Sequence, residues 1–369
     1  MRILISPDKF KNSLTAYEVC DAIERGIRKV KPKAEVIKLP LADGGEGTLD
    51  ILEQQLGAIR VEKEVSNPLF KPVNAYYLLK EEKAYIEMAK ASGLPLLSIV
   101  EKSATKTSTY GTGELILDAI DRGANDIYVM IGGSATNDGG CGMAEALGAK
   151  FYSKSGTELS AIRGRDLSKV HSIDLSLLER FSEVKFTVLS DVQNPLTGKN
   201  GASHVFGSQK GATQADIEFL DEGLKNLAKI LDNGNEDKPG AGSAGGLGYG
   251  LMSFLNAELK SGIGQVFEFL EYDRKLLNVD LIITGEGKLD GQTLGGKVIF
   301  GVASKAKENK IPIGIICGIA EEIDKVKANL DIQMIYQVFE KAKGFRDSMQ
   351  HASIYVEELA KELIQSLNK

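Results

Sequence analysis

The chain is poor in the residues that build disulfide frameworks and zinc sites. Among its 369 residues there are three cysteines, three histidines and no tryptophan. The cysteines, Cys20, Cys141 and Cys317, are far apart and odd in number. This spacing argues against a disulfide scaffold and a Cys-x-x-Cys metal site, and it fits a reducing compartment. The histidines are dispersed, and only His204 is a candidate for catalysis.

Basic tracts and long apolar runs are also lacking. The net charge is −6 and no basic cluster is visible, which argues against a nucleic-acid surface. The longest uncharged run, 239–257, contains six glycines and too few large apolar side chains for a membrane helix. The acidic Asp8 leaves no room for the core of a signal peptide. The sequence therefore predicts a cytoplasmic protein with no membrane or nucleic-acid partner.

Glycine, in contrast, is abundant and clustered. The chain has 40 glycines, and 28 of them fall in five blocks, at 44–47, 111–148, 198–211, 240–250 and 285–301. Glycine permits positive φ and lets the backbone approach a ligand closely. We therefore expect these blocks to form loops around a ligand.

Apolar patterns at both ends of the chain predict a parallel α/β sheet. Strands are expected at 2–6 and 34–41, with a helix between them that begins at a Thr15–Glu18 capping box. The last hundred residues repeat this rhythm, with strands expected at 280–284, 311–317 and 332–339. Five such strands are typical of a flavodoxin-like doubly wound domain.

The middle of the chain has a different pattern. A hairpin is expected at 73–79 and 84–88, further strands at 126–131 and 185–189, and an amphipathic helix at 212–231. We predict a mixed α/β domain, 71–274, inserted into a discontinuous flavodoxin-like domain, 1–70 plus 275–369. A continuous two-domain division near residue 200 is the alternative.

Two glycine patterns resemble nucleotide-binding motifs without their context. Residues 240–245 read G-x-G-x-x-G but follow a predicted loop, whereas the dinucleotide fingerprint follows a strand. Residues 291–297 read G-x-x-x-x-G-K, but Val298 stands where a P-loop has Ser or Thr. Both motifs are rejected. The glycine-rich turn with Lys297 can still bind phosphate through backbone amides.

Acidic residues follow four of the predicted strands: Asp43 with Glu46, Asp138, Asp191, and Glu286 with Asp290. Open α/β sheets bind ligands beyond the carboxyl ends of their strands. Asp191 with Asn194 offers two hard oxygen ligands suited to Mg²⁺, and Glu286 with Asp290 is a second pair. Each residue alone also fits a turn or cap beside glycine. The recurrence of acid and glycine after apolar runs favours a functional interpretation.

Lysines add positive charge to these loops, at Lys9, Lys11, Lys210, Lys288 and Lys297. A single lysine is typical of a solvated surface, whereas several among glycines can neutralise polyphosphate. Ser134 and Ser190 lack the G-x-S-x-G elbow of serine hydrolases. Residue chemistry thus predicts an α/β enzyme that handles a phosphate-bearing ligand with Mg²⁺, and it does not name the substrate.

Eight motifs, in order over nearly the whole chain, carry a family resemblance. They lie at 6–16 (SPDKFKNSLTA), 40–48 (PLADGGEGT), 111–116, 131–143 (IGGSATNDGGCGM), 190–198, 205–212, 239–248 and 280–293 (DLIITGEGKLDGQT). Together they resemble the bacterial glycerate kinase family. The chain departs from the family pattern at Lys9, Asn12 and Cys141, where we expect Ser, Gly and Ala.

The resemblance implies ATP-dependent phosphorylation of D-glycerate at its 2- or 3-hydroxyl group. It also implies a flavodoxin-like domain interrupted by a second α/β domain, with the active site in the cleft between them. Aldolase or dehydratase chemistry on sugar acids and a flavin-binding module remain alternatives. A homo-oligomer stays open.

Phosphoryl transfer needs positioning, metal neutralisation of the polyphosphate and a group that orients the attacking hydroxyl. The expected catalytic residues are Asp191, Lys11 and Asp290, and the expected Mg²⁺ ligands are Asp191, Asn194 and Glu286. The expected substrate and phosphate ligands are Asp8, Lys9, Asp43, Glu46, Ser134, Asn137, Asp138, Gly245, Gly246 and Lys297. The glycine loops at 132–140 and 240–248 are expected to offer backbone amides to phosphate oxygens.

Overall fold

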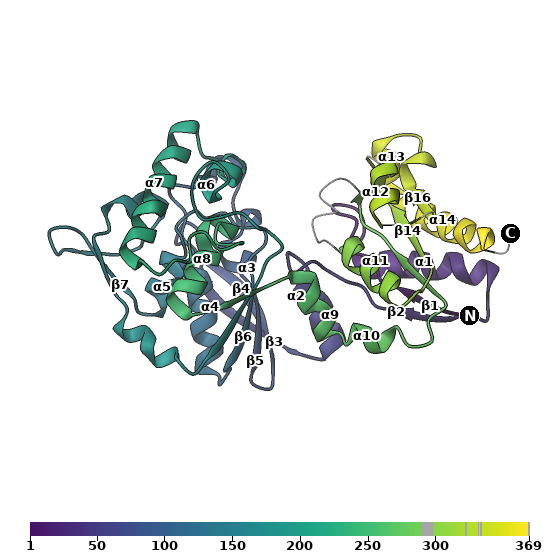
Figure 1. Ribbon diagram of the computed structural model, residues 1–369, viewed down its shortest axis with the longest axis horizontal. Coiled ribbons are helices and arrows are strands. Elements are labelled where there is room, and N and C mark those ends of the chain that lie inside the picture. Colours follow the sequence, from purple (N-terminus) through teal and green to yellow (C-terminus); the bar gives the residue numbers. More distant parts are fainter. Residues whose placement is uncertain (290–297, 322, 331, 333, 368–369) are drawn as a thin grey trace. The chain divides into compact units, whose positions relative to one another are not determined.

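The chain forms two compact units in a computed structural model that describes residues 1–289, 298–321, 323–330, 332 and 334–367 (Figure 1). The first unit comprises Met1–Asp43 and Ile263–Lys369, and the second comprises Gly44–Gly262. The sequence placed these boundaries at 70/71 and 274/275. The first boundary comes earlier because β3 (Ile59–Ser66) pairs with β4 (Pro72–Lys80) over eight residue pairs and so belongs to the second unit.

The first unit contains a parallel sheet of five strands in the order β16-β14-β12-β1-β2. The strands are β1 (Arg2–Ile5), β2 (Glu35–Lys38), β12 (Leu281–Thr284), β14 (Ile313–Cys317) and β16 (Met334–Gln337). Counted along this unit alone, the order is 2-1-3-4-5, which is the flavodoxin-like order. The predicted fold class is confirmed.

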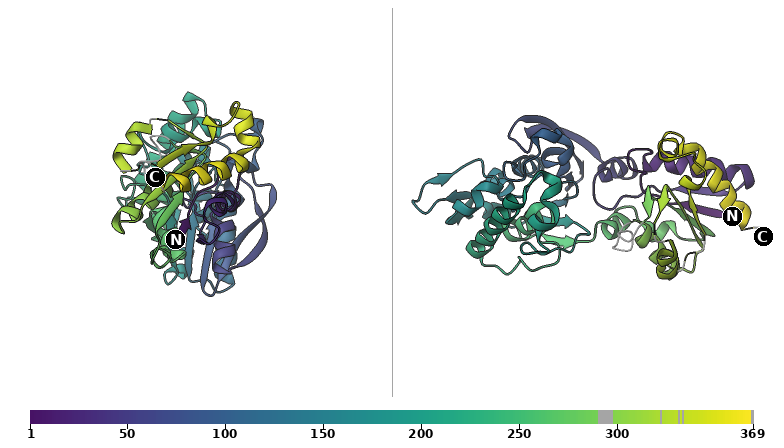
Figure 2. Two further views of the ribbon diagram at one scale, coloured as in Figure 1. Left: turned by 90° about the vertical axis from the view of Figure 1, so that its right-hand side faces the viewer. Right: turned by 90° about the horizontal axis from the view of Figure 1, so that it is seen from above.

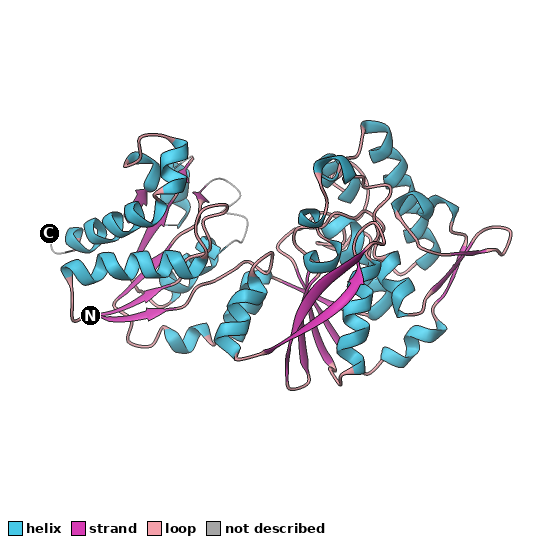
Figure 3. Cartoon of the chain, turned by 180° about the vertical axis from the view of Figure 1, so that it is seen from behind, coloured by secondary structure: helices cyan, strands magenta, loops and turns pink. Residues whose placement is uncertain are grey.

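Helices cover both faces of this sheet (Figure 3). They are α1 (Ala16–Val30), α9 (Gly262–Phe269), α10 (Tyr272–Lys275), α11 (Val298–Glu308), α12 (Ile323–Leu330), α13 (Phe345–Gln350) and α14 (Ala352–Ser366). One apolar core joins β1 to α1 and α14, and another joins β14 to α11 and α12. Gly26 lets α1 and α14 pack closely, because a Cβ there would overlap the carbonyl oxygen of Glu357.

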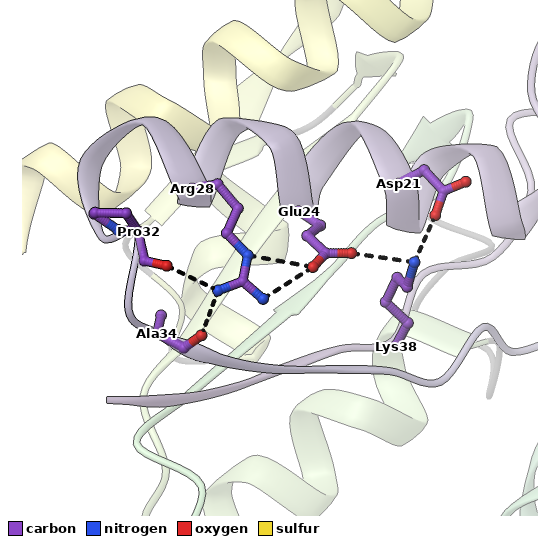
Figure 4. A network of polar contacts seen from close by, with 6 residues as sticks. All are labelled: Asp21, Glu24, Arg28, Pro32, Ala34 and Lys38. Atoms are coloured by element: carbon purple, nitrogen blue, oxygen red, sulfur yellow. Dashed lines mark hydrogen bonds and ion pairs between the residues drawn. The ribbon is translucent and has the colours of Figure 1, made fainter.

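Polar contacts fix the start and the end of α1, and the sequence predicts those at its start. Thr15 and Glu18 form the predicted capping box. At the other end, Arg28 donates to the carbonyl oxygens of Pro32 at 3.1 Å and Ala34 at 2.6 Å (Figure 4). Lys38 of β2 bonds to Asp21 at 2.8 Å, which ties the strand to the helix. Exposed ion pairs of this kind contribute about 1 kcal/mol or less each, so they set the register of the turn more than the stability of the fold.

The second unit is built on a mixed sheet of six strands in the order β11-β10-β6-β5-β4-β3. Besides β3 and β4, its strands are β5 (Lys83–Glu87), β6 (Asp126–Met130), β10 (Lys185–Leu189) and β11 (Glu258–Lys260). The strands β5, β6, β10 and β11 are parallel, while β3 and β4 are antiparallel additions. The predicted hairpin is present as β4 and β5.

Helices lie around the sheet of the second unit (Figure 2), and all of those named next except α2 contribute buried side chains to its apolar core. They are α2 (Thr48–Leu56), α3 (Ala89–Ser92), α4 (Tyr110–Asp121), α5 (Cys141–Leu147), α6 (Ala202–Phe206), α7 (Gln214–Leu231) and α8 (Ser243–Leu255). A small antiparallel sheet consists of β7 (Lys150–Tyr152), β8 (Glu158–Leu159) and β9 (Ser172–Asp174). The predicted helix at 212–231 is α7, which begins at a capping box of Thr213 and Asp216.

Candidate functional site

Three carboxylates of the first unit follow three neighbouring strands. Asp8 follows β1, Asp43 follows β2 and Glu286 follows β12, and these strands lie side by side in the sheet. The pKa of Asp8 is raised to about 7 by burial and then by the negative charges of Asp43 and Glu286, while the amide of Lys9, 2.6 Å away, partly opposes the shift. The structure therefore brings together Asp8, Lys9, Asp43 and Glu286 in one acidic cluster.

The backbone that carries this cluster is held by close contacts around two glycines. The amide of Asp8 donates to the carbonyl oxygen of Gly285 at 2.8 Å. A Cβ at Gly285 would overlap the carbonyl oxygen of Ile316, and one at Gly287 would lie 3.1 Å from the amide nitrogen of Lys11. A larger residue at 285 would push the loop after β12 away from β14, and one at 287 would push it away from the loop after β1.

Asn12 shows why one departure from the family pattern is tolerated. Its φ is 63°, in the left-handed region that favours glycine. Asparagine adopts this region more readily than other residues with a Cβ. The exposed Lys11 precedes it in the same turn. Asp290 and Lys297, which the sequence predicts as site residues, lie outside the described residues.

In the second unit, Asp138 is a fully buried carboxylate in the loop after β6. It accepts hydrogen bonds from the amide and hydroxyl of Thr109, at 2.7 and 2.8 Å, and from the amides of Gly140 and Gly142, at 3.3 and 3.2 Å. Burial raises its pKa, and these hydrogen bonds oppose the rise. Asp138 therefore anchors the loop to the start of α5 and to α4.

Beside Asp138 lies a buried lysine that sequence reasoning treated as one surface cation among several. Lys210 ends the 3-10 turn η5 (Ser208–Lys210) and is 1% exposed. Its Nζ donates to Ser134 Oγ and to the carbonyl oxygen of Thr136, both at 2.7 Å. Burial lowers its pKa to about 7, against the opposing charge of Asp138. The only sequence signal for this burial is its place between Gly207 and Gly211.

Asn137 lies next to these groups, and the oxygen of its side-chain amide has no hydrogen-bond partner. Its Nδ2 donates to Ser203 Oγ at 3.0 Å, and the side chain is fully buried. Its Oδ1 and the hydroxyl of Thr136 have no hydrogen-bond partner. Buried polar atoms without partners are rare in native proteins and call for a missing ligand, water or ion. The structure thus gathers Ser134, Asn137, Asp138 and Lys210 in one place, which we name the β6 loop site.

Two of the glycine blocks pack against each other at this place. Ala244, Gly245 and Gly246 have φ of 54°, 69° and 87° at the start of α8. A Cβ at Gly245 would overlap the carbonyl oxygen of Thr136, and one at Gly246 would lie 2.9 Å from Gly139 Cα. Part of the glycine content therefore serves backbone packing, which shapes the β6 loop from behind.

Few amides of the β6 loop remain for a ligand. The amide of Gly139 donates to the carbonyl oxygen of Gly245 at 3.1 Å, and those of Gly140 and Gly142 donate to Asp138. No hydrogen bond between described residues uses the amides of Ser134, Thr136 and Asn137. The part of the loop that can offer amides to an anion is therefore 134–137.

Asp191 and Asn194 lie in the loop after β10, where each helps to fix the backbone. Asp191 Oδ1 accepts from Ser261 Oγ at 2.8 Å and from the amide of Gly262 at 2.9 Å. The side chain of Asn194 donates through Nδ2 to the carbonyl oxygen of Asn200 at 2.8 Å. The main-chain carbonyl oxygen of Asn194 accepts from the amide of Gly242 at 2.9 Å. The loop after β10 is thereby tied to both ends of the 240–262 segment.

Glu46 is exposed in the glycine-rich turn before α2. This turn is ordered by Glu87, which sequence reasoning did not identify. Glu87, 1% exposed at the end of β5, accepts from the amide of Leu49 at 2.9 Å. Gly47, at the helix N-cap, offers no side chain for this role. Burial raises the pKa of Glu87, and Lys90, 3.7 Å away, opposes the rise.

Over the parts of the chain that the structure describes, no three His, Cys, Asp or Glu side chains form a ready metal-binding group. Over the same parts, no helix has the length and apolar character needed to span a bilayer. Polar loops beyond the carboxyl ends of parallel strands, in both units, are the mark of a ligand-handling α/β protein.

Comparisons with known proteins define the family. The sequence model of the glycerate kinase family matches residues 3–368. A glycerate kinase of Bacillus subtilis (strain 168) is 43% identical over 375 residues, covering 100% of this chain and 98% of the relative. A glycerate 2-kinase of Escherichia coli (strain K12) is 44% identical over 334 residues, covering 88% of this chain and 87% of the relative.

A solved structure agrees with these relatives. The crystal structure of a glycerate kinase 2 from Salmonella typhimurium LT2 has a TM-score of 0.86 and 42% sequence identity, and covers 100% of this chain and 98% of that one. The chain is therefore an α/β phosphotransferase with an alcohol group as the acceptor. It belongs to the glycerate kinase family.

Proposed function

We propose that the protein transfers the terminal phosphoryl group of ATP to the 2-hydroxyl group of D-glycerate, with Mg²⁺, and releases 2-phosphoglycerate and ADP. The family membership supports the acceptor, and the name of the 44% identical E. coli relative supports the 2-position. The three buried, unpaired cysteines fit a reaction in the reducing cytoplasm.

The observation that carries the proposal is the acidic cluster of the first unit. The pKa of Asp8 is raised to about 7 by burial and by the negative charges of Asp43 and Glu286. The described residues contain no ready group of three metal ligands, but Mg²⁺ needs only one or two carboxylates when phosphates and water complete its shell. Glu286, with Asp8 and Asp43 beside it, would hold the ion, which neutralises the charge of the polyphosphate when bound.

The second unit offers the complementary chemistry. The unused amides at 134–137 and the hydroxyl of Ser134 would bind an anionic group of glycerate or of the nucleotide. Gly245 and Gly246 would act by shaping this loop, and Asp138 by anchoring it. Glu46, in its glycine-rich turn, remains a proposed substrate ligand.

The remaining assignments keep the roles inferred from the sequence. Asp191, with Asn194, would bind Mg²⁺ or would orient the attacking hydroxyl and take its proton, as in other phosphoryl transfers. Lys11 would bind the glycerate carboxylate or the transferred phosphate, with Lys9 nearby. Asp290 and Lys297 are proposed on sequence grounds alone.

The test is a coupled ADP-release assay with purified protein, ATP and Mg²⁺, run across D-glycerate, L-glycerate and other small hydroxy acids. We expect ADP release that requires D-glycerate and stops when EDTA removes the metal. Phosphorus NMR of the product should show 2-phosphoglycerate. Absence of glycerate-dependent ADP release would refute the kinase, and a 3-phosphoglycerate signal would refute only the assigned position.

A further inference from the structure

Lys210 is a buried cation whose nearest partners are neutral. Its Nζ contacts a hydroxyl and a carbonyl oxygen, and no ion pair within the described residues includes it. Burying an unpaired charge is costly, and proteins normally pair it or neutralise it. The positive charge of a lysine in this position is therefore available to stabilise a bound anion.

The polar groups around Lys210 are mainly hydrogen-bond donors, so they suit an anion better than a cation. Ser134 accepts from Lys210 through its Oγ, so the hydroxyl hydrogen of Ser134 is left to donate elsewhere. The amides of Ser134, Thr136 and Asn137 are unused, and the Oδ1 of Asn137 is a buried acceptor with no partner. Three amides and one hydroxyl suit a carboxylate or phosphate, and the free Oδ1 suits a hydroxyl group beside it.

Other charged groups near η5 do not compensate Lys210. Asp138 acts on it through space, but its own oxygens bind Thr109, Gly140 and Gly142. On the neighbouring helices, His204 of α6 lies 3.9 Å from Asp221 of α7 and pairs with it. Lys102, which packs against Gly211 through its carbonyl group, adds no negative charge.

We propose that Lys210 is the charge-supplying and positioning residue of the β6 loop site, and that the amine of Lys210 takes up a proton from solvent when an anion binds at 134–137. The protonated ammonium holds Ser134 and the carbonyl of Thr136 in place. Its positive charge then stabilises the ligand through Ser134. The inference rests on the proposed function only for the identity of the ligand, D-glycerate, and not for the existence of the anion site.

The consequence is a proton coupled to binding. A lysine with a pKa of about 7 is half protonated at pH 7. An adjacent anion raises that pKa, so binding takes up about half a proton at pH 7 and more at pH 8, and affinity falls as pH rises. The glycerate carboxylate does not titrate in this range. The protons taken up on binding are therefore bound by groups of the protein.

The experiment is calorimetric titration of the full-length protein with D-glycerate at pH 7 and 8, in two buffers of different ionisation enthalpy. Asp8 also has a pKa of about 7, so the titration is run in the Asp8→Asn background. We expect proton uptake in that background and none once Lys210→Met or Lys210→Arg is added. Lys229→Met, an exposed lysine on α7, is the matched control and should keep the uptake. Ser134→Ala should bind more weakly yet still take up a proton, because Lys210 remains.

Sulfate, which does not titrate near neutral pH, separates this inference from the proposed function. Its stabilisation of the protein against heat should be larger at pH 6.5 than at 8.5 in the wild type, and equal at both in Lys210→Met. This result without any glycerate binding would refute the glycerate kinase activity and keep the anion site. Uptake that survives in Lys210→Met, or no pH-dependent effect of either anion on the wild type, would overturn the inference.

Discussion

The carboxyl group of Asp8, a proposed ligand of the substrate or of Mg²⁺, is buried at a cost to the stability of the fold. Its pKa is raised from 3.8 to about 7, so the folded state binds a proton that the unfolded state has lost between these pH values. Stability therefore falls as pH rises from 4 to 7, and the full penalty is present above pH 7. Groups poised in this way are common at functional sites.

Asp8→Asn should remove this penalty. We expect the variant, measured with EDTA by urea unfolding at pH 8, to be more stable than the wild type by about 2 kcal/mol, with little difference at pH 4. Its phosphorylation activity should fall sharply. Glu358→Gln, an exposed acid on α14, should change neither. An Asp8→Asn variant that is less stable at pH 8 would contradict the prediction.

Two variants can separate the proposed catalytic role of the Asp191 carboxylate from its structural hydrogen bonds. Asp191→Asn keeps an Oδ1 that can accept from Ser261 and Gly262, so the fold should be retained. Loss of the carboxylate should lower kcat by about 10²- to 10⁴-fold, the usual contribution of a group that handles a proton. Ser261→Ala removes one of the contacts and keeps the charge, so it should lower kcat far less. Near-wild-type turnover of Asp191→Asn would exclude Asp191 from the chemistry.

At the scale of the elements, the start of α8 depends on glycine for two separate reasons. Gly245 has φ of +69°, and it also has no room for a Cβ against Thr136. Gly57, at the end of α2, has a similar φ of +62° but open space around it. The pair therefore distinguishes backbone conformation from close packing.

Gly245→Ala should destabilise the protein by about 3 kcal/mol or more, whereas Gly57→Ala should cost only about 1 kcal/mol. Thermal unfolding of both variants measures the difference. Because Gly245 packs on the β6 loop, its variant should also bind D-glycerate more weakly. Equal destabilisation of the two variants would show that backbone conformation alone requires glycine at 245.

The elements also show what sequence patterns could and could not predict. Strands buried on both faces, such as β1 and β12, are short apolar runs and were predicted within one or two residues. The edge strand β3 was missed because half of its residues, in the sequence IRVEKEVS, are charged and most of them are exposed. Charged edges protect sheets from further pairing, and they hide the apolar alternation that identifies a strand.

The same limit applies to the candidate site. The pattern of glycine and acid after a strand predicted the loops that carry Asp43, Asn137 and Asp191. The loop that carries Asp8 has no glycine, and its charged residues and the family resemblance singled it out. Glu87 and Lys210 could not be predicted, since their roles come from burial against loops about 40 and 75 residues away in the chain. Only the tertiary structure brings Lys210 Nζ to Ser134.

At the scale of the whole molecule, the second unit has the properties of an independent domain. Its core contains aromatic and aliphatic side chains from residues 65 to 257 only. We expect a fragment of residues 44–262 to fold alone. Circular dichroism should show mixed α/β structure and one cooperative thermal transition, whereas a fragment without cooperative unfolding would contradict the prediction.

The ends of this unit lie next to each other, since a Cβ on Gly44 would lie 2.8 Å from Gly262 Cα. Evolution can insert a module with adjoining ends into a host without stretching either chain. The same geometry permits circular permutation. A chain in which a short linker joins residues 262 and 44, with new termini in the exposed turn at 154–157, should keep the β6 loop site, because no strand that carries the site is cut.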